Sequence, residues 1–313
     1  SLSDGDIRRW ILGRGKLDAE ISRICNRKPK TVSGGYEIEK IKKMMLDFRI
    51  EVIPVIGKDN TVPEVLVWEK VFKNSVPRQK GKINADVVIM AGGKGTRLDP
   101  FTRILPKPLI PIGEKPIIEI IMEKYEEFGI KEFHISINHK ARMIKSYFEE
   151  MGDNWKIHFV EEKKPLGTIG SLRLVKRIRT DNLFVTNCDI IINGDYEEML
   201  AYHKKNNNDI TLIASYRNFV IPYGVCDIEN GGLLKKIREK PQYDLLVSTG
   251  MYIIKKKTIG LIPGNKRFDA NEFISKVIAL GGKIGVFPVD EKSWIDVGQW
   301  NEYHKSAEKL GMG

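Results

Sequence analysis

From residue 87 onward, short apolar segments alternate with helical patterns. Strands are predicted at Val87–Met90, Glu132–Asn138, Lys156–Phe159 and Asn182–Asn187, with helices between them at Pro116–Phe128, Ala141–Glu149 and Gly167–Arg177. Such alternation is typical of a parallel sheet wrapped by helices. After Asp209 the pattern becomes strand-rich, with strands at Ile210–Tyr216, Gly224–Ile228, Leu233–Glu239 and Ser248–Ile254, a helix at Asn271–Leu280 and a strand at Lys283–Pro288. We therefore expect an α/β domain over residues 85–313, with a mixed, mainly parallel central sheet.

The N-terminal residues have a different character. Predicted elements there are helices at Asp6–Leu12, Ile21–Asn26 and Tyr36–Phe48, and strands at Lys30–Val32, Val52–Ile56 and Glu64–Val67. The polar stretch 74–84 contains Pro77 and Gly81 and shows no apolar period, which indicates a linker. We expect a small α+β unit over residues 1–73 and a linker over 74–84.

Composition limits the function classes. The chain has 313 residues, of which 42% are hydrophobic and 30% charged, and no run of apolar residues is long enough to cross a membrane. The three cysteines, Cys25, Cys188 and Cys226, are widely spaced and form neither a disulfide framework nor a zinc pattern, so we expect a reducing cytoplasm. The formal net charge is +11, but no basic block is interleaved with aromatic residues, so we expect no nucleic-acid partner.

A glycine-rich loop follows the first predicted strand of the larger domain. Gly92, Gly93 and Gly95 allow backbone N–H groups to approach phosphate oxygens, and Arg97 adds a fixed positive charge. Lys107 lies between two prolines that stiffen the chain around it. The spacing matches neither a P-loop nor a dinucleotide fingerprint. An anion cradle is the favoured interpretation; a tight turn with two surface cations is the alternative.

The residues Gly-Gly-x-Gly-Thr-Arg-Leu, followed by Pro-Lys-Pro-Leu-Ile-Pro-Ile, resemble the motif of the sugar nucleotidyltransferase family. The resemblance extends over nearly three quarters of the chain and implies a Rossmann-like fold. It implies that Arg97 stabilises the leaving pyrophosphate and that Lys107 lies by the transferred phosphate. The residues expected to bind the NTP are Ala91, Gly92, Gly93, Gly95, Thr96 and Arg97.

Two aspartates are candidates for holding Mg2+. Asp189 follows the predicted strand Asn182–Asn187, and a carboxylate at the end of a parallel strand points into the crevice where ligands bind. Asp296 lies in Trp294-Ile295-Asp296-Val297-Gly298. Mg2+ is often held by one or two carboxylates and substrate phosphates, and the resemblance implies the same pair, with Asp189 also catalytic. The alternatives are a helix N-cap for Asp189 and a turn for Asp296. Cys188 has no evident partner base, so we expect packing.

Further elements of the resemblance concern the two substrates. The run Glu162 to Gly170 resembles the family element in which a loop glycine packs on the base and a residue five positions earlier reads its edge, which implies Gly167 and Glu162. Because guanine offers two adjacent N–H donors that suit a carboxylate, we favour GTP; the alternative is that Glu162 faces solvent. The residues expected to bind the sugar phosphate are Tyr223, Gly224, Glu239, Lys240, Ser248 and Gly250. For Glu239 and Lys240, the alternative is an exposed ion pair at a strand end.

Residues 1–72 resemble part of a CBS-domain pair, the regulatory module that often binds adenine nucleotides. Ser3 and Asp6 keep the spacing of the CBS nucleotide motif, whereas Val67 and Lys70 replace it in the second repeat. We therefore expect that this segment binds an adenine nucleotide or takes part in a homo-oligomer. Packing or dimerisation is the favoured role.

Together these patterns predict an enzyme that transfers a nucleoside monophosphate from an NTP to a sugar 1-phosphate. The resemblance to CBS-fused members suggests GTP and an amino sugar such as glucosamine 1-phosphate. The alternatives are a mannose- or glucose-1-phosphate nucleotidyltransferase using GTP or UTP, and a catalytically silent regulatory scaffold that binds nucleotide.

Overall fold

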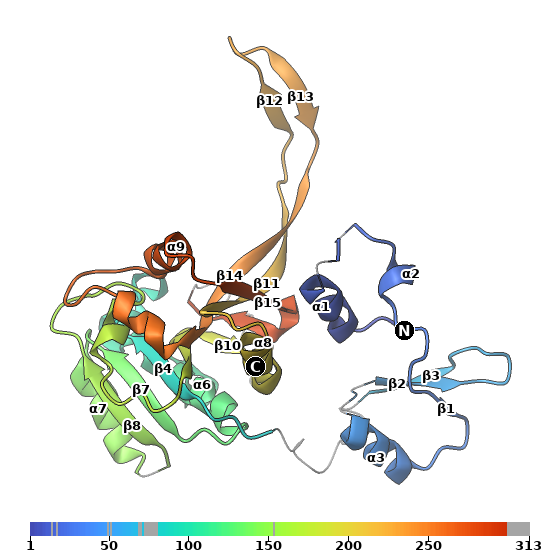
Figure 1. Ribbon diagram of the computed structural model, residues 1–313, viewed down its shortest axis with the longest axis horizontal. Helices are drawn as coiled ribbons and strands as arrows, with labels where there is room; N and C mark the ends of the chain where they lie inside the picture. The colour runs from blue at the N-terminus through green and yellow to red at the C-terminus, as the bar shows by residue number, and fades with distance from the viewer. Residues whose placement is uncertain are drawn as a thin grey trace. The chain divides into compact units, whose positions relative to one another are not determined.

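The computed structural model describes residues 1–298 apart from residues 14, 17, 49, 51, 68–70, 72–80 and 153 (Figure 1). The chain divides into two compact units, Ser1–Lys80 and Gly81–Gly313. The linker predicted over 74–84 lies outside the described residues up to residue 80.

The small unit contains the predicted elements within a few residues. Its helices are α1 (Asp4–Leu12), α2 (Ile21–Ile24) and α3 (Ile38–Phe48), and its strands are β1 (Val32–Ser33), β2 (Val52–Ile56) and β3 (Glu64–Val67). Strand β1 pairs in parallel with β2, and β2 pairs antiparallel with β3. The apolar stripe of α3 packs Ile41 and Met45 against Ile53 and Val55 of β2, which gives this unit its own core.

The large unit is built on a seven-stranded sheet with the order β15-β11-β14-β9-β4-β7-β8. Its strands are β4 (Asp86–Ala91), β7 (Glu132–Ile137), β8 (Lys156–Glu161), β9 (Asn182–Asn187), β11 (Ile210–Val220), β14 (Gln242–Lys255) and β15 (Ile284–Val289). Strands β9, β4, β7 and β8 are parallel neighbours, whereas β14 pairs antiparallel with both β9 and β11. The predicted mixed, mainly parallel sheet is therefore confirmed.

Helices and short strand pairs complete the large unit. The helices are α5 (Phe101–Ile104), α6 (Ile117–Glu126), α7 (Ala141–Glu150), α8 (Tyr196–Lys205) and α9 (Ala270–Ala279); the short strands are β5 (Pro111–Ile112), β6 (Lys115–Pro116), β10 (Ile190–Ile192), β12 (Val225–Ile228), β13 (Leu234–Arg238) and β16 (Trp294–Asp296). In the described part of the chain, no helix is long and apolar enough to cross a lipid bilayer.

The helix predicted over Gly167–Arg177 is wrong. The structure has a short 3-10 helix at Gly170–Leu174, and the chain then runs without regular structure. Tertiary hydrogen bonds override the helical pattern at both ends. The segment around Phe268 exchanges backbone hydrogen bonds with Leu166 and Ile169, and the Asp86 carboxylate accepts the backbone N–H groups of Arg179 and Thr180.

The core of the large unit lies on both faces of the sheet. On one face Val88, Leu183, Val185 and Ile210 pack with Phe273 of α9 and neighbouring apolar residues. On the other face the rings of Tyr125 and Tyr196 lie 4.7 Å apart and contact Phe184 of the central strand β9. The central strands are thus covered on both sides, as their apolar composition requires.

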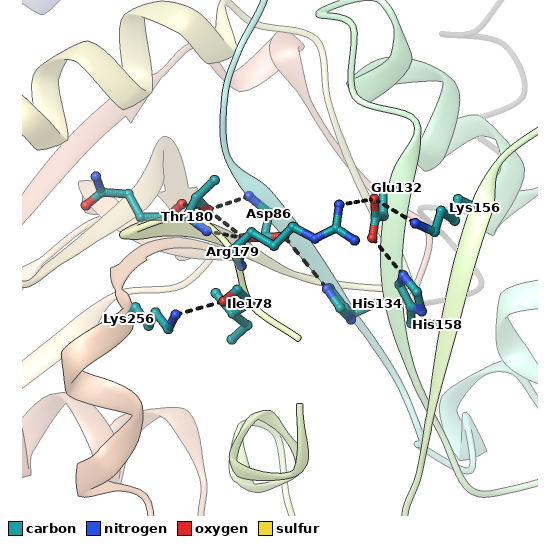
Figure 2. A network of polar contacts seen from close by, with 10 residues as sticks. Asp86, Glu132, His134, Lys156, His158, Ile178, Arg179, Thr180 and Lys256 are labelled. Carbon is teal, nitrogen blue, oxygen red and sulfur yellow. Dashed lines mark hydrogen bonds and ion pairs between the residues drawn. The ribbon is translucent and has the colours of Figure 1, made fainter. Parts of the chain in front are cut away.

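A polar network ties together the amino ends of the parallel strands (Figure 2). Asp86, the first residue of β4, accepts hydrogen bonds at 2.7 Å from the backbone N–H groups of Arg179 and Thr180 and from the Thr180 hydroxyl. Glu132, the first residue of β7, contacts His158 Nε2 at 2.7 Å and Arg179 Nη1 at 3.1 Å. We call this group the amino-edge network. It leaves the opposite edge of the same strands for ligands.

Candidate active site

The glycine-rich loop begins where β4 ends, at Ala91, and two of its glycines are required by their surroundings. Gly95 has a φ of +69°, and a Cβ there would lie 2.8 Å from Thr102 Cγ2 and 3.0 Å from Lys107 Cβ. A Cβ on Gly92 would collide with the carboxylate of Glu162. A Cβ on Gly93 would meet no atom within 4 Å, so this position of the loop is open. The loop is thus held close to two of the predicted site residues.

Two contacts that the sequence did not reveal fix the segment after the loop: an ion pair within the segment and a lysine at the start of α7. Arg103 and Asp99 form a bidentate ion pair, with both N–O distances at 2.7 Å. Lys140, at the start of α7, donates to the carbonyl oxygens of Thr102, Arg103 and Ile104. These carbonyls belong to the end of α5, where a cation stabilises the unpaired acceptors.

Lys107 and Asp189 form a buried ion pair. Lys107 lies between Pro106 and Pro108 and is the first residue of a short 3-10 helix, Lys107–Leu109. Its side chain is only 10% exposed. Asp189 follows β9, and its side chain is 9% exposed. The interpretation of Lys107 as a surface cation is therefore wrong. The N-cap alternative for Asp189 is also wrong, because strand β10, not a helix, follows it.

Strand pairing brings Asp296 to Asp189. Strand β10 pairs antiparallel with β16 in a register that places Ile190 opposite Asp296, and Val297 N donates to Asp189 O at 2.9 Å. A Cβ on Gly298 would lie 2.9 Å from Asp296 Oδ1 and 3.3 Å from Lys107 Nζ, and would clash with the Asp189 carboxylate. Gly298 therefore marks the point where the three charged groups meet. It is a site residue that sequence reasoning left without a role.

The electrostatics of this cluster are visible at Asp296. Burial raises the pKa of its carboxyl above the ordinary value, and the Asp189 charge raises it further, whereas the hydrogen bond from Gly298 N and the charges of Lys107 and Arg97 oppose the rise. Two carboxylates in one place repel each other, and a cation relieves that repulsion. Arg97 itself is exposed, with its charge close enough to act on the cluster.

The donor set fits Mg2+. Within the described residues, no group of three or more His, Cys, Asp or Glu side chains is arranged to hold a metal. Two carboxylates are what Mg2+ requires from a protein when substrate phosphates supply the other oxygen ligands. Asp189 and Asp296 are the residues that would hold it. Cys188 is buried, and its burial raises the pKa of the thiol to about 12, which agrees with a packing role.

Glu162 lies at the same edge of the sheet, and it is buried. Its Oε1 accepts a hydrogen bond from Ser136 Oγ at 2.6 Å, and its Oε2 accepts the backbone N–H of Leu166 at 3.0 Å. The alternative that Glu162 faces solvent is therefore wrong. Ser136, which points from β7 toward Glu162, was not predicted; its single signal in the sequence is a polar residue inside a buried strand. Gly167 has a φ of +84° and packs against Phe268 and Asp269.

Two of the predicted sugar-side residues lie in β14, which pairs with β9, the strand that leads to Asp189. Ser248 lies at the edge of a bulge in β14 and Gly250 lies within it, where the register shifts opposite Ile213 and Ala214. Gly250 has a φ of +88°, and a Cβ there would touch Asn187 Nδ2. Since Asn187 is two residues before Asp189, the bulge reaches the edge of the metal cluster. Ser248 is exposed and Gly250 buried.

The other four sugar-side residues lie elsewhere. Tyr223, Gly224, Glu239 and Lys240 are all exposed. They lie in the ribbon that continues β11 and β14 into β12 and β13, away from the sheet (Figure 1). Gly224 and Glu239 are neighbours across this ribbon, where a Cβ on Gly224 would be 3.2 Å from Glu239 Oε2. The structure does not bring these four residues to Asp189.

Comparison with known proteins places this geometry in context. Residues 86–312 match the family model described as nucleotidyl transferase. A mannose-1-phosphate guanyltransferase from Yarrowia lipolytica is 32% identical over 227 residues, which cover 69% of this chain and 61% of that protein. The chain therefore spans about three fifths of the length of that relative.

Shorter relatives align over nearly their whole length. A D-glycero-alpha-D-manno-heptose 1-phosphate guanylyltransferase from Campylobacter jejuni is 29% identical, with 69% of this chain and 96% of that protein covered. The crystal structure of HddC from Yersinia pseudotuberculosis complexed with GMP-PN is 29% identical, with a TM-score of 0.57 and with 72% of this chain and 100% of that chain covered.

Proposed function

The chain belongs to the nucleotidyl transferase family, and from this premise we propose that it transfers a nucleoside monophosphate from an NTP to a sugar 1-phosphate and releases pyrophosphate. The observation that carries the proposal is the meeting of Lys107, Asp189 and Asp296 at Gly298. One cation and two carboxylates there lie at the carboxyl edge of a parallel sheet beside a glycine-rich loop. Ligands bind at this edge in open α/β sheets.

The residues divide the work of an in-line displacement. An oxygen of the sugar phosphate attacks the α-phosphorus, a new P–O bond forms, and the bond to the bridging oxygen of the pyrophosphate breaks. Such a reaction needs positioning and charge neutralisation more than covalent chemistry. The amides of the loop from Gly92 to Thr96 hold the phosphates, Arg97 neutralises the departing pyrophosphate, and Lys107 lies against the transferred phosphate. Mg2+ held by Asp189 and Asp296 supplies further neutralisation when it is bound.

We propose GTP as the nucleotide. Glu162 supports this choice because its carboxylate is buried at the loop and accepts two hydrogen bonds, while about four lone-pair positions exist on a carboxylate. The remaining positions can accept the two adjacent N–H donors of guanine. The guanylyltransferase relatives and the GMP-PN complex of the Yersinia protein point the same way.

The test is pyrophosphate release with Mg2+, crossing four NTPs with several sugar 1-phosphates. Glucosamine 1-phosphate is our first choice of sugar; mannose, glucose and D-glycero-α-D-manno-heptose 1-phosphates complete the panel. Turnover with GTP and glucosamine 1-phosphate supports the full proposal. Turnover with another pair keeps the enzyme class and rejects the specificity. No turnover with any pair, from folded protein that binds nucleotide, favours the regulatory scaffold.

A matched pair of variants tests the base contact. We expect Glu162→Gln to lower kcat/KM for GTP by about 10–100-fold, because an amide offers one acceptor oxygen where the carboxylate offers two. Glu161→Gln is the control, since Glu161 is exposed and pairs with Lys145. Equal effects of the two substitutions would contradict a role for Glu162 in reading the base.

For the small unit, we propose the CBS-type interpretation of residues 1–73. The order β1, α3, β2, β3 with a parallel first pair supports it. Ser3 and Asp6 form a capping box at the start of α1, with Ser3 Oγ donating to Asp6 Oδ2 at 2.7 Å, so a structural role accounts for this pair as well. A thermal shift with ATP or AMP that disappears in Asp6→Asn would support adenine-nucleotide binding, and no shift would reject it.

A further inference from the structure

Lys140 lies at the junction of β7 and α7, and its backbone has an unusual conformation. It is the N-cap residue of α7, with a φ of +53° and a ψ of +35°, in the left-handed region that residues other than glycine rarely adopt. Residues in this region persist when their surroundings over-determine them, and they gather at functional sites. The contacts of the Lys140 side chain supply such surroundings.

The ammonium group of Lys140 makes three hydrogen bonds to the last three residues of α5. Its Nζ lies 3.1 Å from Thr102 O, 2.6 Å from Arg103 O and 2.8 Å from Ile104 O. A lysine ammonium has three N–H donors, so all of them are used and none remains for a substrate. Lys140 can therefore act on a substrate only through the turn that it holds.

The turn at residues 102–104 lies against the glycine-rich loop. Thr102 is 6% exposed, and a Cβ on Gly95 would lie 2.8 Å from Thr102 Cγ2 and 3.0 Å from Lys107 Cβ. The methyl group of Thr102 therefore packs against the backbone of the loop, beside Lys107. Because protein interiors are close-packed, a shift of Thr102 is transmitted to Gly95.

Lys140 attaches this turn to the strand that also holds Glu162. The ion pair between Arg103 and Asp99 joins two residues of the same segment, so it does not connect that segment to the sheet. Near the carboxyl end of β7, Ser136 Oγ donates to Glu162 Oε1 and Asn138 Nδ2 donates to Glu162 O, both at 2.6 Å. The end of β7 and the residues that follow it thus hold both the carboxylate proposed to read the base and the turn that supports the loop.

We propose that Lys140 is a positioning residue of the transferase reaction. By attaching the end of α5 to the end of β7, it keeps Thr102 against Gly95 and so holds the amides of the loop in the arrangement that binds the triphosphate of the NTP. The inference rests on the proposed function. A loop that must be ordered at the moment of binding loses affinity, whereas a loop that is fixed beforehand does not.

The first experiment replaces Lys140 by methionine, which keeps the apolar stem and removes the three donors. The Kd for GTP, measured by isothermal titration calorimetry, and the KM for GTP should each rise about tenfold or more, whereas kcat should stay within about threefold of wild type. Lys131→Met is the matched control, because Lys131 precedes β7 at its other end, is 67% exposed and pairs with Glu126. A role in stability alone would lower the active fraction and leave Kd and KM unchanged, and that result overturns the proposal.

Limited proteolysis tests the attachment without any substrate. Trypsin cuts after Arg103, inside the turn that Lys140 holds, and mass spectrometry quantifies this cut. Lys140→Met should be cut there about tenfold faster than the wild type, because local opening exposes the bond, and Lys131→Met should be cut at the wild-type rate. Equal rates in Lys140→Met and wild type overturn the proposal. Faster cutting in Lys140→Met, with no transferase activity in the wild-type chain, rejects the proposed function, and the change in Kd for GTP then decides the role of Lys140.

A second variant, Thr102→Ser, tests the contact between the turn and the loop, and it also serves if Lys140→Met does not fold. Serine retains the backbone carbonyl that Lys140 holds and removes only the methyl group that packs on Gly95. The Kd for GTP should rise about threefold, since the loop loses a close packing partner, while the cut after Arg103 keeps its wild-type rate. A wild-type Kd in Thr102→Ser would show that the turn does not position the loop, and it would overturn the proposal.

Discussion

The two ends of the parallel strands in the large unit carry opposite kinds of polar groups. At the amino ends, Asp86 and Glu132 are satisfied by backbone amides, a threonine hydroxyl, an arginine and a histidine (Figure 2). At the carboxyl ends, Asp189 and Asp296 share a single buried lysine and repel each other. A satisfied network stabilises the native state, whereas crowded like charges stabilise it only when a ligand is bound. The polar groups that stabilise the fold and the charged groups of the candidate site therefore lie at opposite ends of the same strands.

The largest effect we expect comes from the carboxyl edge. Asp189→Asn keeps the shape of the side chain and removes its charge, so turnover should fall by about 10³-fold, similar to the loss of a strong transition-state contact. Circular dichroism and nucleotide binding should show that the variant is folded. A variant that retains more than a tenth of the wild-type kcat would break the comparison, because the edge would then be structural at both ends.

Asp86→Ala should lower stability and leave turnover nearly unchanged. It leaves the backbone N–H groups of Arg179 and Thr180 without their acceptor at a half-buried position. A lost acceptor costs about 1–3 kcal/mol per buried donor and less where water can reach the amide, so the free energy of unfolding should fall by roughly 2 kcal/mol. Urea denaturation measures the change. The kcat of the folded fraction should stay within about threefold of wild type, since Asp86 lies at the far end of β4 from the loop. A selective loss of kcat would contradict the division between the two ends.

The pH dependence of stability tests the amino ends of the strands through His203. This buried residue hydrogen bonds to Thr211 Oγ1 and to Asn182, the first residue of β9. Burial, followed by the charge of Lys255, lowers the pKa of His203 to about 4. Because the unfolded chain has a His pKa near 6.5, unfolding takes up a proton as the pH falls. The stabilisation is complete above about pH 6.5 and is lost as the pH falls toward 4, by about 3 kcal/mol.

Urea denaturation at intervals between pH 7.5 and 4 measures this loss. His203→Gln is the comparison variant: it cannot titrate, so its stability curve should be flatter over the same interval. If both proteins lose stability in parallel, the amino-end histidine does not contribute, and other titrating groups account for the acid sensitivity.

The smallest effect is expected from Arg179→Ala. The side chain is 61% exposed and pairs with Glu132, and exposed pairs contribute at most about 1 kcal/mol. The substitution keeps the backbone N–H group that donates to Asp86, so it isolates the surface ion pair from the half-buried hydrogen bonds. A loss in the free energy of unfolding as large as that of Asp86→Ala would show that the charge, and not the amide contacts, holds the amino-edge network together.

The sequence predicted those elements that short local patterns determine, and it failed where distant contacts determine the backbone. The strands β4, β7, β8 and β9 follow from short apolar runs, and the loop at Gly92–Gly95 and the aspartates follow from motifs of a few residues. The helix expected over Gly167–Arg177 failed because distant partners hold the chain at both ends: Ile169 N donates to Phe268 O, 99 residues away, and Arg179 N donates to Asp86, 93 residues away. The strands β11 and β14 were predicted too short, because polar residues such as Arg217 and Asn218 interrupt the apolar pattern while their cross-strand partners continue the ladder.

The site shows the same limit. No motif indicated a role for Ser136 or Gly298. The contact of Ser136 with Glu162 becomes visible only in the fold, and so does the position of Gly298 at the charge cluster, which the pairing of β16 with β10 creates. The sequence predicted the two strands of the ribbon, Gly224–Ile228 and Leu233–Glu239, but not that β12 and β13 form a separate pair away from the sheet (Figure 1). Chemistry-bearing residues were visible in the sequence, whereas the contacts that position them required the fold.

The pairing of β10 with β16 also fixes when the charge cluster can first form. Asp189 emerges from the ribosome long before Asp296, and at about 5–20 residues per second the interval is about 5–20 s. During that time Lys107 and Asp189 can meet, but the second carboxylate does not yet exist. A nascent chain therefore holds Lys107 and Asp189 without Asp296, and the charge cluster is complete only after Asp296 has been synthesised and β16 has paired with β10.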